Sequence, residues 1–102
     1  MIARTWTARA TDDNVRVYVA FFETTVVPQL RAIPGHLGAI VTTRGAEISV
    51  TTFWESMAAV GRFADPIDVA VVEPEARAVL ESFDELVRHA EVAVDTLSRD
   101  AG

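Results

Sequence analysis

The chain has 102 residues, half of them apolar, a formal net charge of −6 at pH 7 and no cysteine. This length makes a single domain, and the acidic balance without a basic stripe excludes a nucleic-acid interface and makes anionic membranes poor partners. The lack of cysteine rules out disulfides and thiolate metal sites, and with no apolar run long enough for a membrane span and no signal-peptide pattern, we expect a cytoplasmic protein.

The first half of the chain predicts a strand followed by a helix. Residues 2–10 alternate, with Ile2, Arg4, Trp6 and Ala8 on one face, and Thr11 supplies N-cap chemistry just after them. Apolar residues then recur at helical spacing: Val15, Tyr18, Val19, Phe22, Val26, Leu30 and Ile33. Pro28 interrupts this pattern, so we expect a kink or a break there.

The second half predicts a hairpin, further helices and a last strand. Strands over 37–44 and 47–54 are joined by a tight turn, and Ser56 caps a short helix that ends at Asp65. Residues 67–83 are ambiguous: Val69–Val72 fit a strand or a helical turn, and Pro74 is typical of a helix start. Alternation over 86–95 predicts the last strand. We expect one domain over 1–97 and a frayed tail over 98–102.

This order predicts an α+β, ferredoxin-like split βαβ fold, with helices on one face of a four-stranded antiparallel sheet. We expect the first and third strands to be adjacent and parallel. The face without helices carries many apolar and threonine side chains: Thr5, Thr7, Ile40, Thr42, Thr51, Phe53 and Val87. Such a face is too apolar to be fully solvated, so we expect two copies to pack face to face as a homodimer.

Six segments together carry a recognisable pattern: the first strand 1–6, the stretches 27–31 and 33–39 around Pro34-Gly35-His36, the motif Phe53-Trp54-Glu55-Ser56, the stretch 62–64 and the last strand 87–92. In this order they resemble the antibiotic biosynthesis monooxygenase family of dimeric α/β-barrel proteins. The resemblance implies a sheet-to-sheet dimer with one pocket per subunit between sheet and helices. Some members of the family oxygenate aromatic polyketides without metal or flavin, and others degrade haem.

The haem-degrading branch does not fit this chain. Its members resemble one another in an asparagine on the first strand, a tryptophan late in the second helix and a histidine ten residues further on. Counted from Trp54-Glu55-Ser56, the last two positions fall on Phe63 and Glu73, and the first strand has no asparagine. We therefore expect neither haem nor another cofactor, and no metal site; His36 or His89 would be the alternative iron ligand.

Aromatic and arginine side chains are the first candidates for a small-molecule site. Trp6 and Trp54 are expected on the helix-covered face, where they either sandwich an aromatic substrate or fill the core. Arg4 and Arg88 lie on strands expected to be neighbours, and each guanidinium binds a carboxylate, binds a substrate oxyanion or reaches solvent. The Tyr18 hydroxyl is either a pocket donor or a core group bonded to backbone.

If the chain is an enzyme, the resemblance implies a cofactor-independent monooxygenase acting on a phenolic or polyketide-like aromatic. Its apolar cage consists of Trp6, Tyr18, Phe22, Trp54 and Phe63, its proton acceptor is His36 or His89, and its oxyanion partner is Arg4 or Arg88. The alternative is a non-enzymatic, dimeric small-molecule-binding or structural module of the same fold. An open cavity in which a histidine and an arginine converge would favour the enzyme.

Overall fold

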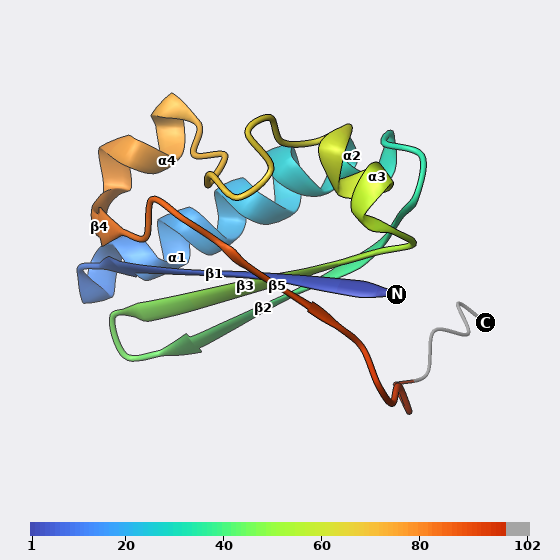
Figure 1. Ribbon diagram of the computed structural model, residues 1–102. Coiled ribbons are helices and arrows are strands. Elements are labelled where there is room, and N and C mark those ends of the chain that lie inside the picture. Colours follow the sequence, from blue (N-terminus) through green and yellow to red (C-terminus); the bar gives the residue numbers. More distant parts are fainter. Residues whose placement is uncertain (98–102) are drawn as a thin grey trace.

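A layer of helices covers one face of an antiparallel sheet in the computed structural model, which describes residues 1–97 (Figure 1). The α+β, ferredoxin-like arrangement predicted from the sequence is therefore confirmed. The elements, in chain order, are β1 (Ile2–Ala10), α1 (Asp12–Phe21), the π-helical turn η1 (Phe22–Val26), α2 (Val27–Arg31), β2 (His36–Arg44), β3 (Glu47–Trp54), α3 (Met57–Gly61), α4 (Pro74–Val79), β4 (Leu80–Phe83) and β5 (Arg88–Glu91).

The strands are ordered β2-β3-β1, and the free edge of β1 is shared by β4 and β5. The expected parallel pairing of the first and third strands is wrong: β1 and β3 are antiparallel, with Ile2 opposite Trp54 and Trp6 opposite Val50. The reason is the connection. The helical segment returns the chain so that β2 runs in the direction of β1, and the tight turn at 45–46 then reverses β3.

The single last strand expected over 86–95 is instead two short strands. β4 pairs with Ala8–Ala10, and β5 pairs with Ile2–Thr5 at the other end of β1. Between them the chain leaves β1 and bonds to the 67–73 segment: Ala70 donates to the Glu85 carbonyl, and Val87 donates to the Asp68 carbonyl. The backbone groups of 85–87 are thus satisfied away from the sheet, which divides the edge strand.

The long helical segment continues through Pro28 without a break. Pro28 has no N–H and cannot donate to the carbonyl one α-turn earlier. The preceding turn, η1, is π-helical, and the Val27 N–H reaches back five residues to the Phe22 carbonyl. Buried Val15, Tyr18 and Phe22 lie on the side of this segment that faces the sheet. Its outer side stays open, since Val17 is half exposed.

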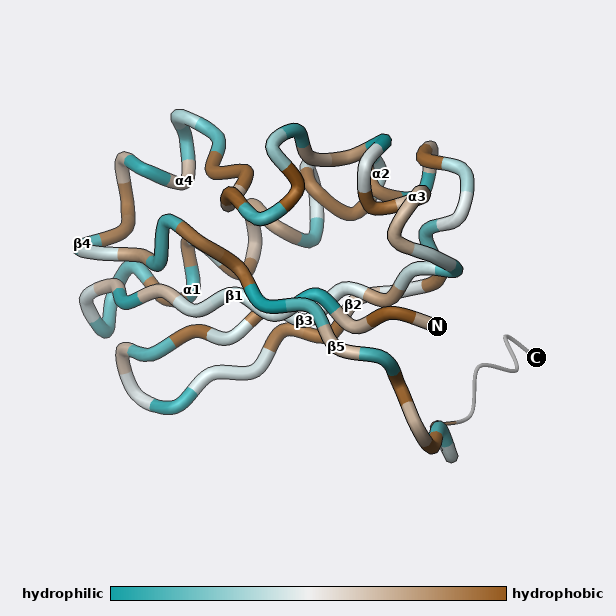
Figure 2. The backbone as a smooth tube through the Cα atoms, viewed as in Figure 1, coloured by the Kyte–Doolittle hydropathy of each residue, from teal (hydrophilic) through white to brown (hydrophobic). Residues whose placement is uncertain are grey.

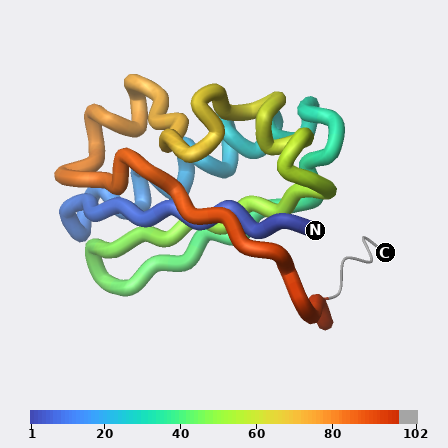
Figure 3. Tube along the Cα trace, viewed as in Figure 1, coloured from blue at the N-terminus to red at the C-terminus, as the bar shows by residue number. Residues whose placement is uncertain are grey.

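The segment 62–73 crosses the helical layer between α3 and α4 without regular structure (Figure 3). Its apolar stretch Val69–Val72 is drawn in brown in Figure 2. Val72 packs against the core, whereas Val71 is 48% exposed. The second part of this segment, residues 67–73, closes one side of a cavity and is called the cover below.

The opposite face of the sheet carries no helix (Figure 1). Ile40 is 39% exposed there, and Phe53 is half-buried on the same face. Val87, which was expected on this face, is buried on the helical side instead. The predicted frayed tail, 98–102, lies outside the described residues.

Candidate functional site

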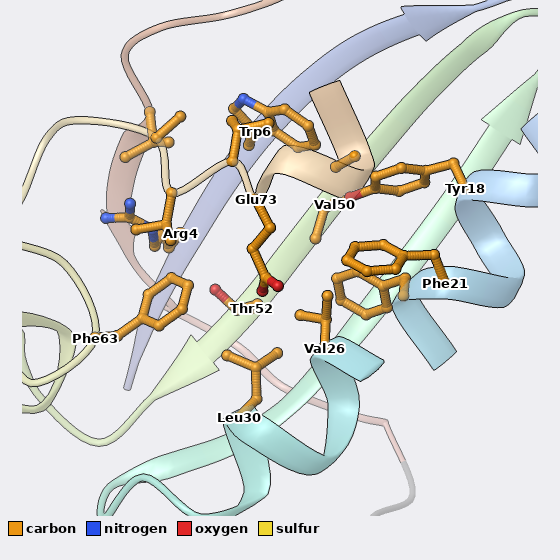
Figure 4. A pocket seen from close by; sticks show the side chains of 16 residues that line it. Arg4, Trp6, Tyr18, Phe21, Val26, Leu30, Val50, Thr52, Phe63 and Glu73 are labelled. Carbon is orange, nitrogen blue, oxygen red and sulfur yellow. The ribbon is translucent and has the colours of Figure 1, made fainter. Parts of the chain in front are cut away.

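A cavity of about 60 Å³ lies between the sheet, the α1–η1–α2 segment and the cover (Figure 4). Three layers of the fold supply its walls: the inward face of β1 and β3, the inner side of the helical segment, and the cover. Most of the lining is apolar. The lining residues are Arg4, Trp6, Tyr18, Phe21, Phe22, Val26, Leu30, Val50, Thr52, Phe63, Ala70, Val71, Val72, Glu73, Ala76 and Val87.

Four of the five aromatic residues predicted to form a cage line this cavity. The rings of Trp6 and Tyr18 are 6.2 Å apart between centroids, and those of Tyr18 and Phe22 are 6.3 Å apart. Phe63 contributes a further ring from the residues just after α3. Phe21, at the end of α1, also lines the cavity, and its ring centroid is 6.5 Å from that of Tyr18.

Arg4 is buried in the cavity wall, with 4% of its surface exposed. Its Nη1 donates to the Ile67 carbonyl and its Nη2 donates to the Val69 carbonyl at 2.9 Å. The guanidinium also lies over the Phe63 ring, 5.5 Å from the centroid. Burial lowers the pKa of Arg4, because desolvation disfavours the charged form. Arg4 therefore joins β1 to the cover through backbone oxygens, where sequence reasoning offered a carboxylate or solvent.

His89 lies behind Arg4, outside the cavity lining. Its Nε2 is 3.0 Å from Arg4 Nη1, and its Nδ1 is 3.3 Å from an oxygen of Asp68. Because a guanidinium only donates, Nε2 accepts and the ring proton belongs on Nδ1, facing the carboxylate. Burial first, and the charge of Arg4 second, lower the pKa of His89. The neutral imidazole thus orients Arg4 and does not reach the cavity.

Glu73 is the lining residue that sequence reasoning missed. It immediately precedes α4, and Figure 4 shows its carboxylate pointing into the cavity among apolar side chains. Within residues 1–97 its side chain makes no hydrogen bond or ion pair in the structure. The pKa of Tyr18 is raised, first by burial and then by the negative charge of Glu73. One pointer to this position was present in the sequence: counted from Trp54-Glu55-Ser56, it is where the haem-degrading branch of the family that the chain resembles carries a histidine.

The sequence matches no protein-family model and no curated protein sequence. Its fold, in contrast, matches the structure of a Chloroflexus aurantiacus protein that is named as an antibiotic biosynthesis monooxygenase. The TM-score is 0.62 and the sequence identity is 18%, over 95% of this chain and 96% of that one. This chain has the fold of the antibiotic biosynthesis monooxygenases. The structure of Rv0793 from Mycobacterium tuberculosis is similar to the same extent, with a TM-score of 0.63 at 15% identity over 94% of this chain and 98% of that one.

A third structure with the antibiotic biosynthesis monooxygenase fold was solved with a small molecule. It is a monooxygenase from the gene ActVA-Orf6 of Streptomyces coelicolor, in complex with nanaomycin D. The TM-score is 0.55 at 26% identity, over 64% of this chain and 62% of that one. The resemblance inferred from the sequence motifs is thereby confirmed at the level of the fold.

Trp54 does not line the cavity, although it was expected in the aromatic cage. It is fully buried, its indole N–H donates to Thr52 Oγ1 at 2.8 Å, and its ring stacks on Phe63 at 5.5 Å. The antiparallel register explains this placement, because it sets Trp54 opposite Ile2, one inward-facing position beyond Arg4. Trp54 supports the cavity from behind through Phe63.

His36 does not line the cavity; it packs edge-to-face against Trp54, with 5.0 Å between the ring centroids. Its Nε2 is buried and has no hydrogen-bond partner among the described residues. Burial is the largest cause of the lowered pKa of His36, and the nearby positive charge of Arg31 adds to it. His36 is therefore held neutral beside the core, outside the cavity lining.

Arg88 lies apart from Arg4. It pairs with Thr5 on the helix-free face and is exposed, whereas His89 pairs with Arg4 on the covered face. The prediction for the last strand had the two faces exchanged: Val87 was expected on the helix-free face, but it is Arg88 that lies there.

The described residues, 1–97, contain no group of three histidine or acidic side chains close enough to hold a metal ion. None of their helices has the length and apolar character that a membrane span requires.

Proposed function

We propose that the chain is a monooxygenase that oxygenates a hydroxylated, polyketide-like aromatic without a bound metal or flavin. The observation that carries this proposal is the cavity itself: an aromatic cage lined by the Glu73 carboxylate and by Tyr18, with the guanidinium of Arg4 in its wall. The complex of the Streptomyces coelicolor monooxygenase with nanaomycin D supports a small-molecule ligand in this fold.

The reaction needs a substrate that can supply its own electrons. A proton leaves an acidic CH₂ group flanked by hydroxylated rings, and the electron pair remains on the substrate as a delocalised carbanion. The carbanion reduces dioxygen and forms a C–O bond, giving a peroxide. The peroxide anion takes the proton back, and loss of water then leaves a carbonyl, so that R₂CH₂ and O₂ give R₂C=O and H₂O without an external reductant.

The residues around the cavity suit this chemistry. Trp6, Phe22 and Phe63 offer ring faces to a planar substrate and exclude water, which strengthens polar interactions with the developing anion. Tyr18, protonated because its pKa is raised, is a hydroxyl donor for an oxyanion. Arg4 supplies positive charge from the wall.

The cavity volume sets a condition on binding. About 60 Å³ is far below the roughly 300 Å³ of small-molecule pockets, so an aromatic ligand enters only if the cover moves outward. The cover is the part of the wall suited to move, because it lacks regular structure and its Val69 and Val71 side chains are exposed.

Oxygen uptake and ligand binding test the proposal together. Purified protein, treated with a chelator and shown by mass spectrometry to carry no flavin, is mixed with hydroxylated anthrones and naphthalenes. We expect quenching of Trp6 fluorescence, a higher melting temperature and oxygen uptake with one product carbonyl per O₂. Binding by no member of the series, together with no oxygen uptake on an anthrone, would refute the proposal.

The small cavity volume favours a second candidate function, a binding module without catalysis. Such a module would bind an aromatic ligand, stabilise on binding and leave dioxygen unchanged. The same measurements separate the two, because both candidates predict a higher melting temperature but only the monooxygenase predicts oxygen uptake.

We also propose that two chains pair through the helix-free face. Ile40, Phe53 and the threonines beside them form an apolar surface there that a second copy would cover. Thr51→Arg would place an unpaired charge in this interface and produce monomers or aggregates. Sedimentation at micromolar concentration, with Ala20→Arg on the exposed outer side of α1 as control, measures the effect; a monomeric wild type would refute the pairing.

A further inference from the structure

We propose that Glu73 is the general base of the cavity, taking a proton from an acidic C–H or O–H group of the aromatic substrate. This inference rests on the proposed function and deepens it, because it assigns the proton acceptor and narrows the substrate class. In the step, the substrate C–H or O–H bond breaks, its electron pair stays on the substrate, and the proton forms an O–H bond with a carboxylate oxygen of Glu73.

Glu73 is singled out because each other polar side chain in the lining is unsuited to accept a proton. Arg4 has no acceptor atom. Thr52 already accepts the Trp54 indole N–H, and a neutral hydroxyl is a very weak base. Tyr18 stays protonated because its pKa is raised. Among the described lining residues, the carboxylate of Glu73 alone combines negative charge with free lone pairs.

The two histidines do not compete for this role. His89 accepts a hydrogen bond from Arg4 through Nε2, which faces the wall and not the cavity. His36 packs against Trp54 and does not line the cavity. A carboxylate on the cover, in contrast, points directly into the space that an aromatic ligand would occupy (Figure 4).

The strength of the base narrows the substrate class. In water a carboxylate is a weaker base than a phenolate by about six powers of ten, so proton transfer from an ordinary phenol is about a millionfold unfavourable. The substrate is therefore a carbon or oxygen acid stronger than phenol, with an anion delocalised over two or more rings. A ligand that already carries a carboxylate is disfavoured, since it would meet Glu73 in an apolar cavity.

Proton transfer is measured directly with 1,8-dihydroxyanthrone, whose absorbance shifts to longer wavelength on deprotonation. Without oxygen, the wild type is expected to shift this absorbance, and Glu73→Gln is expected to bind the probe without the shift. Glu75→Gln is the matched control: it removes the same charge from the first turn of α4, but Glu75 is exposed and does not line the cavity. Anthracene, which has no acidic proton, should show the same affinity for all three proteins.

With oxygen admitted, Glu73→Gln should lose at least about 100-fold in the rate of oxygen uptake, and Glu75→Gln should keep the wild-type rate. Glu73→Asp should recover part of both the shift and the rate, and it provides a second test if Glu73→Gln folds poorly. Unchanged shift and uptake in Glu73→Gln would overturn the role of Glu73 and leave the proposed function standing. A wild type that shifts the probe but consumes no oxygen would overturn the proposed function and support Glu73 as proton acceptor. A wild type that does neither would overturn both.

Discussion

Replacing Arg4 by methionine tests whether this side chain holds the cover closed. Methionine fills most of the same space but donates no hydrogen bond, so the carbonyls of Ile67 and Val69 lose their partners. Bonds from a charged donor contribute about 1.5–3 kcal/mol each, which gives about 3–6 kcal/mol for the two. Removing the buried charge offsets part of this loss, because desolvating a guanidinium costs several kcal/mol.

The position of the two carbonyls decides the balance. Val69 is 39% exposed, so its carbonyl and that of Ile67 can turn toward water once the guanidinium is gone. We therefore expect a loss near the lower end, about 2–3 kcal/mol of unfolding free energy. For a domain of this size that corresponds to a fall of about 8–20 °C in melting temperature.

Thermal unfolding followed by circular dichroism measures the global effect, and hydrogen exchange measures the cover itself. Two amides hydrogen-bond the cover to residues 85–87: Ala70 donates to the Glu85 carbonyl, and Val87 donates to the Asp68 carbonyl. Both amides should exchange faster in Arg4→Met. Arg88→Met is the control, since it removes an exposed arginine from β5. Equal melting temperatures for Arg4→Met, Arg88→Met and wild type, with unchanged exchange at both amides, would refute the reasoning.

Three further changes test the packing around the cavity. Trp54→Ala should cost about 3–5 kcal/mol in urea unfolding, since the side chain is fully buried, whereas Trp54→Phe should cost much less and leave ligand affinity unchanged; a large affinity loss in Trp54→Phe would show that the indole does touch ligand. Gly35→Ala should cost about 2–4 kcal/mol, because φ is +94° and a new Cβ would lie 2.5 Å from the Cβ of Ala59; calorimetry that finds no loss would contradict this. Burial lowers the pKa of both His36 and His89, so the unfolded chain binds protons that the folded chain does not, and stability present above about pH 6.5 should be lost as the pH falls from there toward 5. A melting temperature that is constant from pH 7 to pH 5 would contradict the histidine assignment.

Residue alternation and helical spacing were enough to predict most of the covered face of the sheet. Arg4 and Trp6 were placed correctly on the inward face of the first strand, and Tyr18 and Phe22 on the inward side of the helix, because periods of two and 3.6 residues directly determine which side chains share a face. The aromatic cage followed from those placements, with Trp54 as the exception. The Trp54 side chain was correctly predicted to point inward. Whether it reaches the cavity depends on its position along the sheet, which is set by the residue of β1 opposite it.

Glu73 and Arg88 show where local pattern fails. The cover has no period, so the spacing of apolar residues within 67–73 does not indicate that the Glu73 side chain turns into the cavity. The last strand alternates over ten residues, yet alternation alone does not say which face is inward, and Arg88 was assigned to the wrong one. Both are decided by long-range contacts: residues 85–87 pair with the cover, and Arg4 holds the cover through its carbonyls.

The sequence by itself thus determined the fold class and the inward residues of β1 and the main helix, since these depend on neighbours within a few positions. Only the tertiary structure decided the antiparallel register of β1 with β3, the division of the last strand, and which polar side chains (Arg4, Tyr18 and Glu73) come together at the cavity. The physical reason is that register and loop path are set by hydrogen bonds between segments far apart in the sequence, such as those that place Ile2 opposite Trp54 and those from Arg4 to Ile67 and Val69, and no local preference encodes them.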